Sequence, residues 1–334
     1  MIAIHNSAVG FHPRWITYCE DKKILYKIVD CCATDIISQL QDCHALLWHH
    51  SQGNRKDILI AKQILFALEH TGFKVFPDFY TAWYFDDKVA QKYLLERIGA
   101  PLVPSYVFYE KLEAFEWAMK TKYPKVWKLR GGAGSANVRL VRTKSEAIKI
   151  IRKAFGSGFK QYDSWASLAE RWRKYRLGKI DLINVIKGVV RLGYEPEFSK
   201  IGGRQRGYAY FQDFVPNNSF DIRVVVINRK TFAIKRMNRA NDFRASGSGE
   251  IYYDKSLFNM EIIKLSLDIA FKLQSQCIAL DYVYQDDQPL VVEISYGFSQ
   301  NGYDDCPGYW DEELNWHEGK FNPQGWMVEL ILKN

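Results

Sequence analysis

The sequence predicts an α+β protein that begins with a small α/β domain. Its 334 residues, 47% of them hydrophobic and 25% charged, are enough for two or three domains with ample cores. Residues 1–85 alternate short apolar strands with helices, whereas the chain from Tyr208 onward is dominated by consecutive strands. We expect an N-terminal domain at 1–85, a smaller subdomain at 86–213 with an insertion at 156–207, and a C-terminal subdomain at 214–334.

The N-terminal domain is predicted to contain a parallel sheet. Apolar runs near 24–28 and 44–48 indicate strands, and residues 73–77 (FKVFP) indicate another. The helix between them has its apolar positions at helical spacing, with Asn54 as a candidate cap and Gly72 as its end. This β, α, β order is typical of a parallel sheet covered by helices.

The middle of the chain continues the alternation and then changes in character. We expect a helix from Asp86 or Asp87 to Gly99, a strand at 105–109, a helix at 111–121 and a strand at 125–129 that runs into a glycine-rich turn. The insertion at 156–207 is basic. Its residues Trp165, Leu168, Trp172 and Tyr175 fall at helical spacing, so we expect them to pack inward.

The C-terminal part predicts a mostly antiparallel sheet. Strands are expected at 208–215, 220–227 and 231–237, followed by a helix at 261–275 and a hairpin of 278–284 with 289–295.

Composition limits the class of protein. No stretch of about 18 apolar residues is present, so a cytoplasmic location is the default expectation. The six cysteines lack C-x-x-C spacing and are expected to be reduced. The net charge of +8 favours anionic ligands such as nucleotides or phosphosugars.

The predicted hairpin contains two opposed carboxylates. Asp281 and Glu293 lie symmetrically about position 287, so they should face each other with Cβ atoms about 5 Å apart. Two carboxylates this close would resist ionisation unless a cation lies between them, and magnesium prefers such oxygen ligands. A solvated edge hairpin is the alternative. Because the flanking residues are apolar, we favour the metal.

Two further segments indicate phosphate binding. In WKLRGGAGSANV (127–138) a lysine ends a strand before a Gly-rich loop, whose N–H groups could close around phosphate oxygens. An ordinary hairpin turn has the same composition. The run KRMNRANDFRASGSG (235–249) carries Arg236, Arg239 and Arg244. Several arginines in one short loop are typical of a polyanion-binding site, and a solvated basic surface is an equally good interpretation.

In this order the segments resemble the ATP-grasp superfamily, most closely its ribosomal-protein glutamate ligase (RimK-like) branch. The resemblance covers roughly 85–300 and implies an ATP-grasp fold with an N-terminal pre-ATP-grasp α/β domain. It also implies ATP and Mg²⁺ as cofactors. The implied ATP-binding residues are Lys88, Lys128, Gly131, Gly132, Gly134, Ser135, Gln212, Asp213, Phe214, Val215, Asp221 and Lys235.

The resemblance also assigns roles at the reacting centre. It places Arg236 on the γ-phosphate and Arg244 on an acyl phosphate, as the catalytic residues. Metal ligands correspond to Asp281, Glu293 and Ser295, although Ser295 stands where the family carries asparagine. The family's acceptor position makes His12, Arg14, His49 and His50 candidates for substrate contact.

The activity that the resemblance implies is a carboxylate-amine ligase. ATP would phosphorylate a carboxylate, and an amine would attack the acyl phosphate. A phosphotransferase on the same fold and a nucleotide-binding regulatory protein with a weakened metal site remain as alternatives. Similarity to ATP-grasp proteins of surface-polysaccharide gene clusters suggests a sugar acid or amino acid as substrate. The expected partners are small molecules and not nucleic acid.

Overall fold

The fold is described from a computed structural model. It covers residues 1–7, 9–131, 137–176, 178, 180–193, 196–238 and 249–333, without the side chains of residues 166, 170, 174 and 198. The chain divides into two compact units. The first comprises Met1–Phe85, Ala90–Leu102 and the chain from Asn217 onward. The second comprises Asp86–Val89 and Val103–Pro216. Each unit is described separately below.

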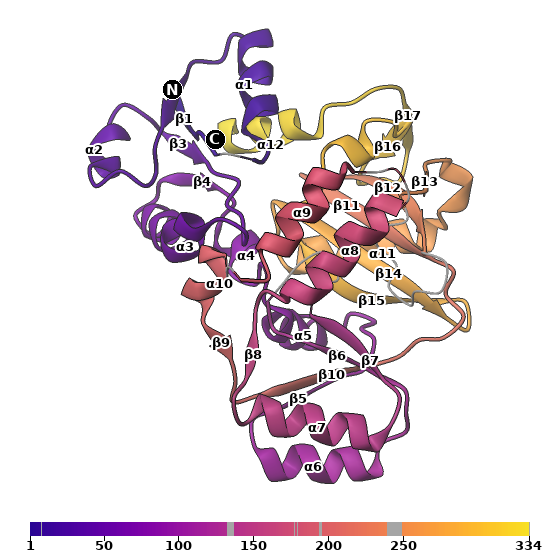
Figure 1. Ribbon diagram of the computed structural model, residues 1–334. Coiled ribbons are helices and arrows are strands. Elements are labelled where there is room, and N and C mark those ends of the chain that lie inside the picture. The colour runs from indigo at the N-terminus through magenta and orange to yellow at the C-terminus, as the bar shows by residue number, and fades with distance from the viewer. Residues whose placement is uncertain are drawn as a thin grey trace. The chain divides into compact units, whose positions relative to one another are not determined.

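The first unit opens with a parallel sheet, as the sequence predicts. Strands β1 (Ile2–His5), β2 (Tyr26–Val29), β3 (Ala45–Leu47) and β4 (Lys74–Phe76) lie in the order β2-β1-β3-β4 and all pair in parallel (Figure 1). Helices α1 (His12–Asp21), α2 (Ile36–Gln39), α3 (Arg55–His70) and α4 (Phe79–Ala82) connect or follow them. Asn54 caps α3 by accepting a hydrogen bond from the Lys56 N–H, so the predicted cap is confirmed.

The larger sheet of the first unit is antiparallel. Strands β11 (Phe220–Ile227), β12 (Lys230–Met237), β14 (Cys277–Gln285) and β15 (Gln288–Ser295) pair in the order β15-β14-β11-β12. The predicted hairpin is β14–β15. Its two-residue turn is Asp286-Asp287, and both residues adopt the positive φ that such a turn requires. Helix α11 (Met260–Lys272) packs on one face of this sheet, on Ile222, Val224 and Leu280.

The remaining elements extend this sheet or join it to the N-terminal domain. Strand β13 (Ile251–Tyr252) pairs with β12, and β16 (Gly308–Trp310) and β17 (Trp316–Glu318) continue the sheet beyond it. Short helices η1 (Lys255–Leu257) and η2 (Asn301–Tyr303) lie in the connections. Helix α12 (Pro323–Leu332) contributes Trp326, Met327 and Val328 to a core that also contains residues of β1 and β11. The N-terminal and C-terminal parts therefore share one core.

The second unit contains a four-stranded antiparallel sheet with helices. Strands β5 (Ser105–Phe108), β10 (Ala209–Asp213), β6 (Lys125–Lys128) and β7 (Val138–Val141) pair in the order β5-β10-β6-β7. Helices α6 (Lys111–Lys120) and α7 (Lys144–Ala154) bury Ala114, Ala118, Ala147 and Ile151 against it. Helix α5 (Lys88–Arg97) begins in this unit and continues in the first.

The predicted insertion contains a helical hairpin. Helices α8 (Ser164–Arg176) and α9 (Leu182–Val190) are flanked by β8 (Phe159–Lys160), α10 (Glu197–Gly202) and β9 (Arg204–Gln205), and β8 pairs with β9. The expected inward packing of the aromatic face of α8 is wrong, because Trp165 is 70% and Trp172 50% exposed. The helices instead meet at Gly188, where a Cβ would lie 3.0 Å from Leu168 and 2.8 Å from Arg171.

All six cysteines are free, and four of them are buried. In the described ranges, no helix has the length and apolarity needed to cross a membrane.

Candidate functional site

A cluster of charged side chains lies on one face of the large antiparallel sheet. The strand register pairs Arg223 with Asp281, Asp281 with Glu293, and Asp221 with Arg236. Residues paired across strands point to the same face, as do residues two apart on one strand. All five side chains therefore lie on the face opposite α11. The predicted register of Asp281 and Glu293 is confirmed, and a bulge in the β14–β15 ladder follows it directly.

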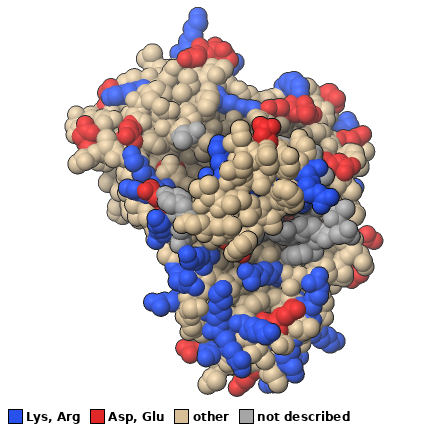
Figure 2. Space-filling model, in the orientation of Figure 1, with Lys and Arg blue, Asp and Glu red and all other residues tan. Residues whose placement is uncertain are grey.

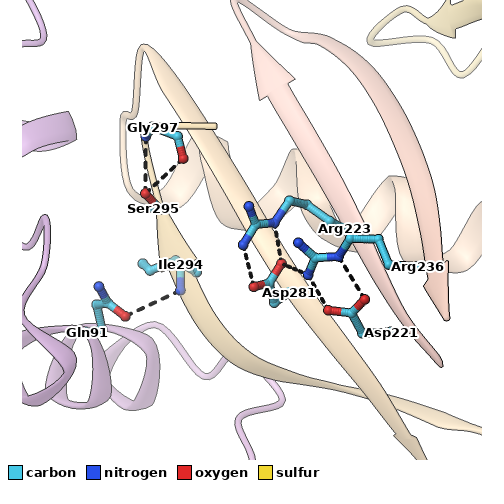
Figure 3. Close-up of polar contacts among 8 residues, drawn as sticks. All are labelled: Gln91, Asp221, Arg223, Arg236, Asp281, Ile294, Ser295 and Gly297. Atoms are coloured by element: carbon cyan, nitrogen blue, oxygen red, sulfur yellow. Dashed lines mark hydrogen bonds and ion pairs between the residues drawn. The ribbon is translucent and has the colours of Figure 1, made fainter. Parts of the chain in front are cut away.

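Ion pairs join this cluster. The Arg223 guanidinium donates two hydrogen bonds to the Asp281 carboxylate, at 2.5 and 2.6 Å (Figure 3). Arg236 donates to Asp281 at 3.0 Å and forms a two-point contact with Asp221. Asp281 thus receives hydrogen bonds from two guanidinium groups. The cation that sequence reasoning required beside this carboxylate is supplied, in part, by the protein itself.

Burial and the arginines have opposite effects on the pKa values of the two buried acids. Burial opposes ionisation of Asp281, but Arg223 and Arg236 outweigh it and lower the pKa of Asp281 to about 2. Burial also disfavours the charged form of Arg223, yet Asp281 more than compensates and raises the Arg223 pKa well above its ordinary value. For Asp221 the balance is different. Its burial raises the carboxyl pKa although Arg236 opposes the change.

Ser295 and Gln91 flank the cluster along β15. The Ser295 hydroxyl donates to the Gly297 carbonyl and accepts from the Gly297 N–H, both at 3.1 Å, so this hydroxyl is engaged by its own chain (Figure 3). The buried Gln91 amide of α5 accepts a hydrogen bond from the Ile294 N–H at 3.3 Å and donates one to the Tyr84 carbonyl at 3.2 Å. Gln91 thereby fixes the strand on which Glu293 and Ser295 stand.

Other predicted site residues of this unit lie elsewhere or outside the described ranges. The Lys235 side chain lies on the face of β12 opposite to that of Arg236. Its ammonium group is 3.9 Å from the centre of the Phe220 ring. The structure does not bring it to the charged cluster. Arg244 lies outside the described residues, as do Arg239 and the predicted loop residues Gly132, Gly134 and Ser135 of the second unit.

In the second unit, the two predicted phosphate-binding lysines come together through the backbone. Lys128 ends β6, and the Lys88 N–H donates to the carbonyl of Arg130, two residues further along the chain. Both lysine side chains are buried. Asp87, which precedes Lys88, pairs with the Arg130 guanidinium at 2.8 Å. Gly131 follows, and a Cβ there would lie 3.1 Å from the carboxylate of Asp86, which leaves little space for a side chain.

The predicted purine-binding segment lies at the end of β10 in the same unit. Gln212 is buried and donates to the Ser105 hydroxyl at 3.1 Å. Asp213 forms an ion pair with Lys125 of the neighbouring strand. Phe214 and Val215 follow the strand, half-buried and without regular secondary structure. These four residues lie in one unit with Lys88 and Lys128.

Three of the predicted substrate-binding residues are histidines of the N-terminal domain. His12 begins α1, and His49 and His50 follow β3. The His49 ring stacks on the Phe11 ring, with 3.9 Å between the ring centres. Its Nδ1 atom accepts a hydrogen bond from the Phe11 N–H at 3.1 Å. Burial lowers the pKa of both His49 and His50 to about 3, so both imidazoles are neutral near pH 7. The His49 ring lies against Gly297 in the loop that follows β15, because a Cβ built on Gly297 would be 3.2 Å from His49 Nε2.

Arg14, the fourth predicted substrate contact, is paired with a carboxylate. Its guanidinium donates two hydrogen bonds to Asp304, at 2.6 and 2.7 Å. The amide of Gln300 also donates to the Gly10 carbonyl. These contacts join the loop after β1 and helix α1 to the segment that follows β15.

Sequence reasoning overlooked Arg223 and Tyr303 as members of the charged cluster. Arg223 stands two positions after Asp221 in an otherwise apolar strand, a signal that places both on one face. Tyr303 is buried near this cluster, and burial raises its pKa to about 12 although Arg223 and Arg236 oppose the change. No periodicity indicates Tyr303, because it comes from a short irregular helix.

Comparison with known structures identifies the fold. A RimK domain ATP-grasp protein from Sphaerobacter thermophilus is similar over 99% of both chains, with a TM-score of 0.58 and 14% identity. D-alanine–D-alanine ligase from Bacillus anthracis is similar over 99% of this chain and 95% of that one, with a TM-score of 0.53 and 15% identity. The ATP-grasp ligase PsnB, complexed with a minimal precursor, is similar over 99% of this chain and 98% of that one, with a TM-score of 0.54 and 12% identity.

No family model and no curated protein sequence matches the chain. The structural likeness establishes that this chain has the ATP-grasp fold, and the predicted fold class is confirmed.

Proposed function

We propose that this ATP-grasp protein is an ATP- and magnesium-dependent carboxylate-amine ligase that acts through an acyl phosphate. The observation that carries the proposal is the charged cluster of the large sheet, where Asp281 and Glu293 stand opposite each other beside Arg223 and Arg236. Opposed carboxylates next to guanidinium groups suit a polyphosphate held with a divalent cation.

The proposed nucleotide-binding residues are the buried cations and the strand end of the second unit. Lys88 and Lys128 would hold phosphate oxygens as point charges. Gln212, Asp213, Phe214 and Val215 would contact the purine. The burial of Gln212 and its hydrogen bond to Ser105 support this role, because a group that is already fixed loses little freedom when a ligand binds. Asp221, expected near the ribose, is held by Arg236, and its ribose role stays a prediction.

Magnesium fits the donor chemistry of Asp281 and Glu293. Carboxylate oxygens are the ligands that this ion prefers. The Oδ1 atom of Asp281 accepts from both guanidinium groups, whereas Oδ2 accepts one hydrogen bond from Arg223 and keeps a second lone pair. When bound, the ion would neutralise phosphate charge. Ser295 is a weaker candidate ligand, because its hydroxyl already bonds to Gly297.

The proposed reaction has two steps. A carboxylate oxygen of the acceptor attacks the γ-phosphorus, and the bond to the β-phosphate oxygen breaks to release ADP. An amine nitrogen then attacks the acyl carbon, phosphate leaves and the amine loses a proton. Arg236 would bind the γ-phosphoryl oxygens and Arg244 the acyl phosphate. Asp221 would orient Arg236, since it accepts two hydrogen bonds from the guanidinium that also donates to Asp281.

The acceptor carboxylate is proposed to be that of a sugar acid or amino acid. His12, Arg14, His49 and His50 remain its candidate contacts. Since burial keeps His49 and His50 neutral, they would act as hydrogen-bonding groups and not as cations.

A second candidate is a nucleotide-binding protein without turnover. The engagement of Ser295 by Gly297 and the pairing of Asp281 with two arginines favour it, because both reduce the ligand capacity of the metal site. This candidate predicts ATP binding without ADP release under any acceptor.

The deciding experiment follows ADP and hydroxamate together. Protein, magnesium and ATP are incubated with hydroxylamine and a panel of sugar acids and amino acids. A ligase gives ADP and a hydroxamate, because an acyl phosphate is electrophilic at carbon. ADP release with a stable phosphorylated product and no hydroxamate would make the protein a phosphotransferase. The control is Glu293→Gln, which should lose both products together.

A further inference from the structure

The insertion of the second unit contains a pocket lined by basic side chains. Its volume is about 350 Å³, and it is lined by Lys160, Arg191 and Lys200 together with Tyr162 and Ser164. These residues come from separate elements: Lys160 from β8, Ser164 from the first turn of α8, Arg191 from the end of α9 and Lys200 from α10. Within the described part of the chain, no acidic side chain lines the pocket.

This lining suits a phosphate-bearing ligand. Lysine ammonium groups act as point charges, and an arginine guanidinium can bind two oxygens of one phosphate. The hydroxyl of Ser164 adds a group that can donate to phosphate oxygens, whereas the Tyr162 hydroxyl donates to the Ser167 hydroxyl at 3.0 Å. The pocket belongs to the insertion, and its lining includes none of the residues proposed to bind the nucleotide.

Next to this pocket, helix α9 exposes an apolar face. Ile183 is 62% and Val190 67% exposed, and Leu182, Ile186 and Val189 are exposed as well. The other face of α9 buries Val185 and Gly188. Figure 2 shows an extended area over α8 and α9 that is largely free of charged atoms. A nine-residue helix that leaves so many aliphatic side chains in water has an unfavourable free energy unless another apolar phase covers them.

The neighbouring helix adds side chains that favour a bilayer interface. Trp165 and Trp172 are both exposed, and tryptophan prefers the boundary between lipid headgroups and acyl chains. The sequence from 159 to 208 also carries an excess of Lys and Arg over Asp and Glu. Aliphatic residues, exposed tryptophans and basic residues on one short helical pair are the combination found in helices that lie in an anionic membrane surface.

We propose that the α8–α9 hairpin and its basic pocket bind the surface of an anionic membrane, with a lipid phosphate in the pocket and the exposed side chains of α9 in the headgroup region. The charge of the hairpin favours an anionic lipid surface over an acidic protein, because the same element also presents aliphatic side chains next to the cations. None of the residues that line this pocket has a role in the proposed reaction, and the proposal is testable without nucleotide.

The test is co-sedimentation of the full chain with vesicles. We expect partition into vesicles of phosphatidylcholine with phosphatidic acid, little partition into phosphatidylcholine alone, and weaker partition as salt increases. Arg191→Ala with Lys200→Ala should lower the partition coefficient about fivefold for each cation removed. Ile183→Glu should lower it by about tenfold or more, since it places a charge where an apolar side chain is expected to enter lipid.

Two control variants match these changes. Lys149→Ala removes an exposed cation from α7, and Leu112→Glu adds a charge at an exposed leucine of α6, in the same unit. Both should partition as the wild type does, and circular dichroism should show all variants folded.

Soluble glycerol 3-phosphate, measured by calorimetry, separates a free phosphate ligand from a lipid surface. Absence of partition into anionic vesicles would overturn the proposal, whether or not glycerol 3-phosphate binds. Partition that the pocket and α9 variants leave unchanged would also overturn it.

Discussion

Asp281 is both a proposed metal ligand and the anion that neutralises two buried arginines. Removing its charge would leave Arg223 and Arg236 without their shared partner inside the protein. The loss of one member of a buried ion pair is costly because the other charge remains desolvated. Glu293 has a smaller structural role, since it lies on β15, the strand at the edge of the sheet.

Asp281→Asn and Glu293→Gln should therefore differ in stability but not in activity. We expect Asp281→Asn to lower the free energy of unfolding by about 1–3 kcal/mol, whereas Glu293→Gln should change it little. Both should lose magnesium-dependent ADP release. Thermal denaturation and an ADP assay measure the two effects. Equal stability of both variants would contradict the role assigned to the arginine pairs.

The buried histidines predict a dependence of stability on pH. The unfolded chain protonates both imidazoles as the pH falls below about 6.5, whereas folded His49 and His50 stay neutral until about pH 3. The unfolded state thus binds more protons within this window. The free energy of unfolding should keep the full contribution of these groups above pH 6.5 and lose it progressively between pH 6.5 and 3.

The variant His50→Asn isolates this contribution. It should reduce the slope of unfolding free energy against pH by up to about 1.4 kcal/mol per pH unit within the window. His70→Asn, at an exposed position near the end of α3, is the control and should leave the slope as it is. Urea denaturation at several pH values gives the slopes. A wild-type slope in the His50 variant would show that His50 is not buried neutral.

Single residues also show what sequence reasoning can and cannot find. The carboxylate pair was predictable because strand period and hairpin symmetry fix which residues face each other. The positively charged partner of Asp281 could not be predicted in the same way. Whether a cation between strands is a metal or a guanidinium depends on a third strand, and the pairing of β11 with β14 cannot be read from the hairpin alone.

Among whole elements, helices α1 and α12 make an unusually close contact. A Cβ on Gly325 would lie 2.5 Å from the ring of Tyr18, so only glycine allows this approach. The Tyr18 hydroxyl also donates to the Glu329 carboxylate of the same helix at 2.5 Å. This contact joins elements from opposite ends of the chain.

Gly325→Ala should consequently separate the two helices. We expect a loss of about 1–3 kcal/mol in the free energy of unfolding, the usual cost of overpacking a core. Shortening the partner side chain tests the mechanism: in a Tyr18→Leu background, the same change should cost less, a coupling that a double-mutant cycle measures. Additive effects of the two changes would place the strain elsewhere.

Elements with a clear period were predicted well, and those without one were not. Helix α3, its Asn54 cap and the β14–β15 hairpin agree with the structure because local spacing determines them. The helical spacing of Trp165 and Trp172 correctly indicated α8 but predicted the wrong exposed face. A period shows that a helix has two faces, whereas the neighbour that covers one of them is decided by tertiary contact.

For the whole molecule, nucleotide binding should appear as stabilisation. A ligand that binds only the folded protein at 100 times its dissociation constant adds about 2.7 kcal/mol. Magnesium-ATP should therefore raise the denaturation temperature of the wild type. Lys128→Ala should reduce this shift, because it weakens nucleotide affinity by about 1–3 kcal/mol.

The exposed Lys149→Ala is the matched control for that experiment and should retain the full shift. Calorimetry with a non-hydrolysable ATP analogue gives the affinities directly. An undiminished shift in the Lys128 variant would move the phosphate site away from the end of β6.

The shared core of the first unit has a consequence for how the protein is made on the ribosome. Strands β1 and β3 are synthesised well before α12, yet the core that they enter also contains Trp326, Met327 and Val328 of α12. The nascent parallel sheet therefore has one apolar face uncovered until α12 has been made. Contacts between such distant segments close slowly. During that interval the growing chain is a natural client for chaperones that bind exposed apolar strands.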